Sequence, residues 1–213
     1  MQAQPPGGGA MERLWAETWV LQRRVEREHA VFGDGACWLD YRLYLCRMYG
    51  FFAPLEAELA EVPGLADAVP DAGERIHKTA LLGRDLLALG VERGHLGQIP
   101  RLAVPLLDEL PEALGWMYVA ESVTLDGAEL ARHLEVQMPA ELDGAAAYLR
   151  CYGEDVQERW RRFGAAIDAY VERAGAAACD RIVHAATDCL FQLHRWLAPS
   201  SSVSPARAGR VVA

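Results

Sequence analysis

The segment 114–134 reads LGWMYVAESVTLDGAELARHL and combines a helical apolar pattern with small residues at buried positions. Its bulky apolar side chains recur at three- and four-residue steps, which is typical of the buried stripe of an α-helix. Ser122 and Gly127 interrupt that stripe. Because glycine costs about 1 kcal/mol relative to alanine inside a helix, Gly127 requires a reason such as a kink or a close backbone approach. We expect this helix either to cover a flat ligand or to pack tightly against another helix.

Helical patterns dominate the rest of the chain as well, whereas alternating β-branched runs bounded by turn residues are missing. The sequence therefore predicts an all-α fold, a single-domain bundle of seven or eight helices. The other expected helices are 11–31, one that begins near Asp40 as its N-cap and that Pro54 bends or ends, 72–89, 144–152, 155–172 and 176–197.

The two ends of the chain differ in composition from its middle. Residues 1–10 and 199–213 are rich in proline, glycine, serine and alanine, so we expect a disordered N-terminal extension, a domain over 11–198 and a disordered tail. The start lacks the pattern of a secretory signal, and no run of about 18 apolar residues could span a membrane. Five cysteines without a CxxC pair argue against a disulfide framework and a zinc site. We expect a soluble protein of the reducing cytoplasm.

Charge and motifs exclude several classes of function. The chain has 30 acidic and 21 basic residues, a formal charge of -9 and no basic run, so nucleic acid is not an expected partner. The phosphate-binding motifs GxxxxGK[ST] and GxGxxG are absent. A GxSxG nucleophile elbow is also absent, and Ser122 lies in a helical pattern, so hydrolase chemistry is not expected.

Carboxylates and histidines at helical spacing offer a metal-site alternative. Glu74 and His77 have the ExxH spacing of di-iron bundles, and Asp180 and His184 lie one helical turn apart. Such bundles usually carry two ExxH motifs and this chain has one, so a solvated helix face is the plainer interpretation.

His29 shares a helix face with Gln22 and Trp15, because seven residues are nearly two helical turns. It is either a ligand or a histidine favoured by the negative end of the helix dipole.

The segment 114–134 resembles the distal helix of the bacterial, biliverdin-producing heme oxygenases, commonly of the form LGALYVLEGSTLGGxxIARxL. Further matches in the family's order and spacing cover about residues 12–197: LWAET at Leu14, YGFFAPLEAEL at Tyr49, KTALLGRDLLALG at Lys78, IPRL at Ile99, YGEDVQERWRRF at Tyr152 and FQLHRWL at Phe191. The resemblance implies an all-α fold that holds heme, both substrate and cofactor, between a proximal and a kinked distal helix. It also implies cleavage to biliverdin, carbon monoxide and iron, with electrons from a reductase or a ferredoxin.

The same resemblance implies specific pocket residues on the first helix. Counted along the family's LKxxTxxxH pattern, the proximal histidine position is Gln22, whose amide is a weak iron ligand compared with imidazole. Positions that often carry Lys or Arg for the heme propionates become Trp15 and Trp19. His29 could ligate iron only in a shifted pose, since it lies about 10 Å further along a continuous helix.

On the distal helix, Ser122 and Asp126 replace two of the family's glycines and Gly127 is retained, while Tyr118 is a further candidate pocket residue. Arg161 and Arg162 match a basic position of the family and could contact a propionate.

Three hypotheses follow from the sequence. The first is a heme oxygenase-like protein whose ancestral reaction is heme cleavage, with Gln22 in place of the proximal histidine putting that reaction in question. The second is a non-catalytic pseudo-enzyme that binds a tetrapyrrole, another apolar small molecule or a protein partner. The third is an oxidase with a non-heme metal site on the same fold.

Overall fold

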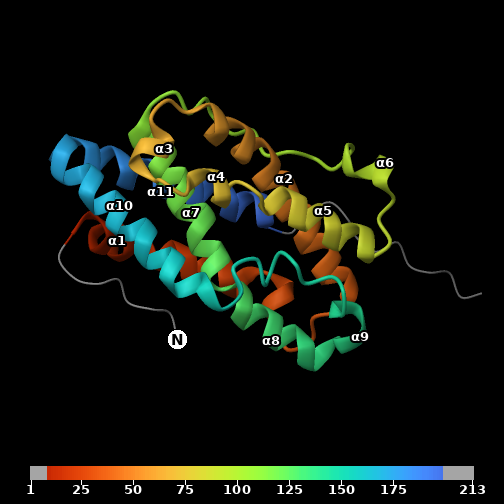
Figure 1. Cartoon of the computed structure of the whole chain (residues 1–213). Coiled ribbons are helices and arrows are strands. Elements are labelled where there is room, and N and C mark those ends of the chain that lie inside the picture. The colour runs from red at the N-terminus through yellow and green to blue at the C-terminus, as the bar shows by residue number, and fades with distance from the viewer. Residues whose placement is uncertain (1–8, 199–213) are drawn as a thin grey trace, which may run out of the picture.

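The computed structural model of the chain describes residues 9–198, apart from the side chains of residues 25–28, and over this range it contains helices and no strand (Figure 1). The all-α class is therefore confirmed. The helices are α1 (Ala10–Glu28), η1 (Ala30–Phe32), α2 (Trp38–Glu61), α3 (Leu65–Ala68), α4 (Ala72–Arg75), α5 (Lys78–Ala88), α6 (Arg93–Leu96), α7 (Leu110–Leu125), α8 (Gly127–Gln137), α9 (Pro139–Leu142), η2 (Gly153–Asp155), α10 (Val156–Ala174) and α11 (Ala176–Leu197). Helix α1 already includes Ala10, and the expected disorder of residues 1–8 and 199–213 lies outside the described residues.

Helix α7 is the central helix of the bundle. It runs through the middle of the molecule in Figure 1 and packs mainly against α11, which in turn packs along α1. Most of its residues are buried, as expected for a helix that is apolar on every side. A Cβ at Gly115 would lie only 2.5 Å from the carbonyl oxygen of Ile182, so this glycine allows α7 and α11 to touch. Tight helix packing does occur in the segment 114–134, at its amino end.

Helix α2 continues through Pro54 to Glu61, so of the two expected effects of this proline, a bend or an end of the helix, the end does not occur. Proline leaves the carbonyl oxygen four residues earlier, that of Gly50, without its helical donor. The backbone N–H of Leu102 donates to this oxygen at 2.9 Å and replaces the missing bond. The N-cap of α2 is Cys37 and not Asp40 as expected. Asp40 is the third residue of the helix, and its carboxylate accepts the backbone N–H of Cys37 at 2.9 Å.

The expected helix 72–89 is divided into α4 and α5 at Ile76 and His77. The carboxylate of Glu56, on α2, accepts the backbone N–H groups of Lys78 at 2.5 Å and Thr79 at 3.2 Å. It thereby satisfies donors that the first turn of α5 leaves free. The start of α5 is therefore set by a capping carboxylate from α2. The hydrophobic pattern of residues 72–89 does not reveal this cap.

The expected helix 114–134 is also interrupted, because α7 ends at Leu125 and α8 begins at Gly127. A Cβ at Gly127 would lie 2.6 Å from the carbonyl oxygen of Leu149. Both reasons expected for this glycine, an interruption and a close backbone approach, are therefore present, and the approaching group belongs to the chain itself.

The expected helix 144–152 was wrong, because this segment forms turns that lead into η2. Its backbone groups bind side chains of other elements. Asp85 accepts the N–H groups of Ala147 at 2.9 Å and Tyr148 at 2.8 Å, and the Tyr41 hydroxyl donates to Ala145 at 2.7 Å. By contrast, α11 has the expected bounds, and α10 differs from the expected helix by one or two residues at each end.

Candidate functional site

A small cavity lies where α1, η1 and α2 meet the carboxyl halves of α7 and α11. Its lining residues are Gln22, Phe32, Tyr44, Met48, Ser122, Val123, Asp126, Leu190 and Leu197. Four of them, Gln22, Phe32, Val123 and Asp126, are partly exposed and mark the mouth, whereas the others are buried and form the floor. The cavity volume is about 30 Å³, which is room for roughly two water molecules. Any large ligand therefore requires the walls to part.

Gln22 is held in the wall by a chain of hydroxyl groups. The Thr18 hydroxyl donates to the carbonyl oxygen of Leu14 at 2.7 Å. It lies 3.0 Å from the Tyr118 hydroxyl, whose proton it must accept because its own is already used. Neither hydroxyl has a proton left for Gln22, so Gln22 presents its NH₂ group to both oxygens, at 3.2 Å from each. Its amide carbonyl oxygen is consequently the polar atom that remains for a ligand.

Asp126 lies at the junction of α7 and α8, and it is the single charged residue among the described residues that line the cavity. Burial raises the pKa of the Tyr44 phenol in the floor, and the negative charge of Asp126 raises it further. Tyr44 is therefore a neutral phenol at physiological pH.

Ser122 lines the cavity close to this junction. Its hydroxyl donates to the carbonyl oxygen of Val119 at 2.9 Å, within the same helix. The Ser122 side chain therefore folds back onto α7, and its only hydroxyl proton is used in this hydrogen bond.

The expected helix 11–31 ends earlier than predicted, because α1 ends at Glu28 and His29 is its C-cap residue. Its Nδ1 accepts the N–H of Val31 at 3.4 Å, and its ring packs edge-on against Tyr44 with 5.4 Å between centroids. Burial lowers the pKa of its imidazole. His29 is thus a neutral histidine behind the aromatic wall of the cavity.

Trp15 and Trp19 are not among the residues that line the cavity. Their rings lie 4.9 Å apart along the surface of α1, and the guanidinium of Arg23 stacks 4.5 Å above the Trp19 ring. The two residues that the resemblance places at the propionate positions are therefore not part of this cavity.

Arg161 and Arg162 are exposed on α10 and do not line the cavity either. Arg161 forms a bidentate pair with Glu158 on the same helix. A propionate contact for these two residues remains a prediction.

The four residues of the metal alternative have separate partners. Glu74 binds Arg159 at 3.0 Å, the His77 ring faces Tyr152, Asp180 binds Arg13 at 2.7 Å, and His184 lies 3.4 Å from Asp188. Among the side chains that the structure describes, no three His, Cys, Asp or Glu gather in a group that could hold a metal ion. The structure gives this alternative no support.

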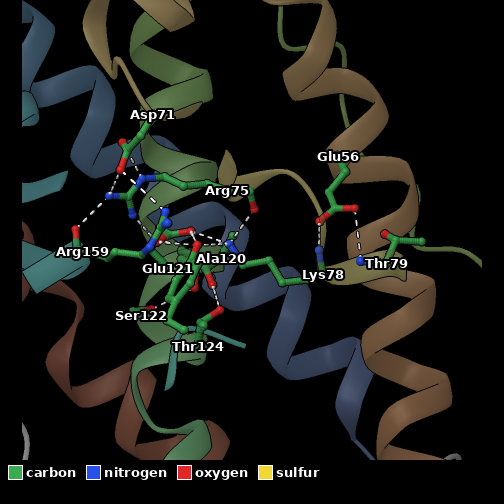
Figure 2. Close-up of polar contacts among 12 residues, drawn as sticks. Glu56, Asp71, Arg75, Lys78, Thr79, Ala120, Glu121, Ser122, Thr124 and Arg159 are labelled. Carbon is green, nitrogen blue, oxygen red and sulfur yellow. Dashed lines mark hydrogen bonds and ion pairs between the residues drawn. The ribbon is translucent and has the colours of Figure 1, made fainter. Parts of the chain in front are cut away.

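Sequence reasoning missed a buried ionic cluster on another face of α7. The carboxylate of Glu121 binds Arg75 Nη1 and Lys78 Nζ, each at 2.5 Å (Figure 2). It also accepts a hydrogen bond from the Tyr152 hydroxyl at 3.0 Å. Arg75 also binds Asp71 through two nitrogens, at 2.8 and 2.9 Å. Arg75 and Lys78 are each 1% exposed and Glu121 is 3% exposed. The cluster joins α4, α5 and the turn directly before η2 to the central helix.

A signal for this cluster was present in the sequence. Lys78 is the only lysine in the chain, and Glu121 is the one acid in an otherwise apolar run of α7. A charge in a helix buried on every side needs an opposite charge from another element. The sequence did not reveal which element would supply it.

Comparison with known proteins identifies the family of this chain. The family model described as heme oxygenase matches residues 24–198. The chain belongs to the heme oxygenase family. Against heme oxygenase from Neisseria meningitidis, solved with NO and CO bound, the TM-score is 0.71 at 18% identity, over 95% of this chain and 99% of that chain. At this identity the likeness shows the fold. No curated protein matches the chain. No helix within residues 9–198 is long and apolar enough to cross a membrane.

The cavity of this heme oxygenase-family chain supplies a poor ligand set for heme iron. Heme iron is usually held by histidine, by thiolate, by methionine beside a histidine, or by tyrosinate. The described lining offers the Met48 thioether, the Tyr44 phenol with its raised pKa, and the Gln22 amide oxygen. It includes no imidazole and no Lys or Arg that would pair with a propionate. These residues do not fit heme iron.

Proposed function

We propose that this chain is a non-catalytic member of the heme oxygenase family that binds a tetrapyrrole in the cavity between α1 and α7. The observation that carries the proposal is the fixed amide of Gln22, which binds Thr18 and Tyr118 at the position where the family resemblance implies the iron ligand. Binding would take place in the cytoplasm and would require neither a reductase nor a ferredoxin.

Two interactions that would hold heme are missing from the described lining of the cavity: a strong ligand for the iron and a cation for the propionates. An amide oxygen is a weaker ligand than a neutral imidazole. The described residues that line the cavity include no Lys or Arg to pair with a propionate. A bound tetrapyrrole must therefore turn its propionates out of the cavity towards solvent.

A hemin titration with a reductant tests the loss of catalysis. We expect purified chain mixed with hemin, an electron donor and oxygen to form no biliverdin above the level of hemin alone. Stoichiometric biliverdin would reject the proposal in favour of an active heme oxygenase. If no tetrapyrrole binds at all, the cavity serves another apolar molecule or a protein partner, and the proposal also fails.

Restoring the ligand provides the complementary test. We expect Gln22→His to tighten hemin binding by about tenfold or more and to sharpen the Soret band, since imidazole replaces an amide at the iron. Gln157→His is the matched control, because Gln157 is exposed on α10 and does not line the cavity. Equal hemin affinity in the two variants would contradict the assignment of Gln22 to the proximal position.

A second candidate, heme binding through His29, rests on one observation. Burial keeps this imidazole neutral, and its ring packs against the cavity residue Tyr44. If His29→Ala removed a hemin spectrum that Gln22→Ala left unchanged, this candidate would replace the first.

A further inference from the structure

We infer that a groove along α11 binds an extended segment of a partner protein, one that combines apolar side chains with lysine or arginine. This α11 groove lies between residues 105–107 and one side of α11, on which Arg181, His184, Asp188 and Gln192 lie. Among the described residues, it shares no lining residue with the cavity between α1 and α7. The inference is therefore independent of tetrapyrrole binding.

The size of the α11 groove suits a short extended peptide. Its volume is about 440 Å³, which lies within the range of roughly 300–1,000 Å³ that is typical of binding sites. Between Arg181 and Gln192 the helix rises by about 16 Å, since each residue adds ~1.5 Å. About five residues of extended chain, at ~3.3 Å each, cover that length.

The floor of the α11 groove is apolar and supplies the affinity. Leu107, Trp116 and Ala185 are buried there, and covering such a floor with apolar side chains removes both surfaces from water. Leu106 also lines the groove and is 74% exposed, so it gains burial when a segment covers it. The indole N–H of Trp116 has no hydrogen-bond partner among the described residues and is not one of their fully enclosed polar atoms. It remains a donor for a carbonyl oxygen of the bound segment.

A second wall of the α11 groove belongs to the segment 103–108, which runs between α6 and α7 (Figure 1). This segment forms neither helix nor turn, and none of its backbone groups makes a backbone hydrogen bond to the described residues. Both flanks are nevertheless anchored. The N–H of Leu102 donates to Gly50 at 2.9 Å, and Glu109 binds Arg181 at 2.6 Å. An extended segment that lies alongside can therefore pair with this fixed, bare backbone as an added strand.

The rim of the α11 groove has an excess of negative charge. Three carboxylates line it, those of Glu112, Asp180 and Asp188. The guanidinium of Arg181 also lines the groove, but two carboxylates hold it, Glu109 at 2.6 Å and Glu112 at 2.8 Å. Arg13, which binds Asp180, adds one more cation, and the carboxylates still outnumber the cations. Lysine or arginine in the bound segment complements this rim, and such exposed charges decide which segment binds more than how tightly it binds.

The test measures the binding of dye-labelled pentapeptides to the full chain by fluorescence anisotropy. The lysine probe Val-Lys-Val-Lys-Val combines positive charge with apolar side chains, and we expect it to bind more weakly as salt is added. The glutamate probe Val-Glu-Val-Glu-Val should bind at least about tenfold more weakly, because the rim repels its carboxylates. A lysine probe methylated at every backbone nitrogen should also lose at least about tenfold, because it has no N–H left to donate to the segment 103–108.

Each comparison can overturn the inference. Absence of lysine-probe binding at millimolar concentration would reject the α11 groove as a peptide site. Equal affinity of the lysine and glutamate probes would reject recognition by charge, and equal affinity of the methylated probe would reject pairing with the backbone. Size-exclusion chromatography addresses another occupant. A dimer that the lysine probe dissociates would assign the groove to a second copy of the chain and overturn the inference.

Two variants locate the binding site. We expect Asp188→Lys to weaken the lysine probe by about tenfold or more and to strengthen the glutamate probe. Asp143→Lys is the matched control, since it makes the same charge change at an exposed position that does not line the groove. Leu106→Ser should weaken the lysine probe by about threefold, whereas Val136→Ser, at an exposed apolar side chain outside the groove, should leave it unchanged. Circular dichroism confirms that each variant is folded. Lysine-probe affinity unchanged in both groove variants would overturn the inference.

Discussion

Glu121 is the residue on which the charge balance of the central helix depends. Its carboxylate lies within 2.5 Å of nitrogens from both Arg75 and Lys78, and all three side chains are removed from water. Burying charges costs several kcal/mol per ion, and mutual attraction with further hydrogen bonds offsets that cost only while every partner is present. The Tyr152 hydroxyl and Asp71 supply these further bonds.

Removing the negative charge should therefore destabilise the fold strongly. We expect Glu121→Gln to lower the free energy of unfolding by roughly 3–5 kcal/mol, because Arg75 and Lys78 lose their shared counter-charge. Chemical denaturation measures this loss. Glu158→Gln, which breaks an exposed pair with Arg161, should produce no measurable change. Equal stability of the two variants would contradict the importance of the buried cluster.

The residues of the site were partly predictable from sequence. The resemblance singled out Gln22, Ser122 and Asp126, and the structure brings these three together around one cavity. It does not bring Trp15 or Trp19 there, because the orientation of an indole on a helix depends on which neighbours pack beside it. The cluster around Glu121 was missed because its partners come from segments 43 and 46 residues away.

At the scale of elements, helix ends were predictable where the signal was local. Gly175, with φ of 86°, separates α10 from α11 and fixes the start of α11 where the sequence placed it. Ends set by distant groups were missed, as at Lys78, where Glu56 of α2 supplies the cap, and at Ala147, where Asp85 takes the backbone N–H. Helix propensity depends only on the residues of the segment itself, whereas these two helix boundaries depend on side chains from distant parts of the chain.

The contact between α7 and α11 gives a prediction for an element. We expect Gly115→Ala to lower the free energy of unfolding by about 1–3 kcal/mol, because the added methyl group meets the backbone of α11 and the helices must move apart. Gly73→Ala, in α4, is the matched control, since a Cβ there has nothing within 4 Å, and it should be neutral or slightly stabilising. Thermal unfolding compares the two. A neutral Gly115→Ala would show that this contact can relax.

At the scale of the whole molecule, folding buries two neutral histidines. Burial lowers the pKa of His29, and burial followed by the charge of Lys78 lowers that of His77. Below the ordinary histidine pKa of 6.5, the unfolded chain binds more protons than the folded chain. Stability therefore falls as pH drops through this window, and these two groups leave it unchanged above the window.

We expect the native chain to lose stability between about pH 7.5 and about pH 5.5, in the range where histidine titrates. The double variant His29→Gln/His77→Gln should lose less over the same range. Asp40, whose pKa is lowered below 3.8 mainly by its hydrogen bond from the Cys37 thiol, acts only at more acid pH and does not obscure the comparison. Denaturant midpoints at both pH values measure the effect. Identical pH dependence in the two proteins would contradict it.

The burial of Lys78 also determines how the protein can be labelled. As the only lysine of the chain, it is also the only side-chain amine that an amine-reactive dye or surface could attack. In the folded protein its ammonium group is enclosed by Glu121, Tyr152 and the carbonyl oxygen of Arg75. Acylation of Lys78 therefore requires the bundle to open. The rate at which Lys78 is acylated therefore reports how often the bundle opens. Mass spectrometry measures this rate without any engineered probe.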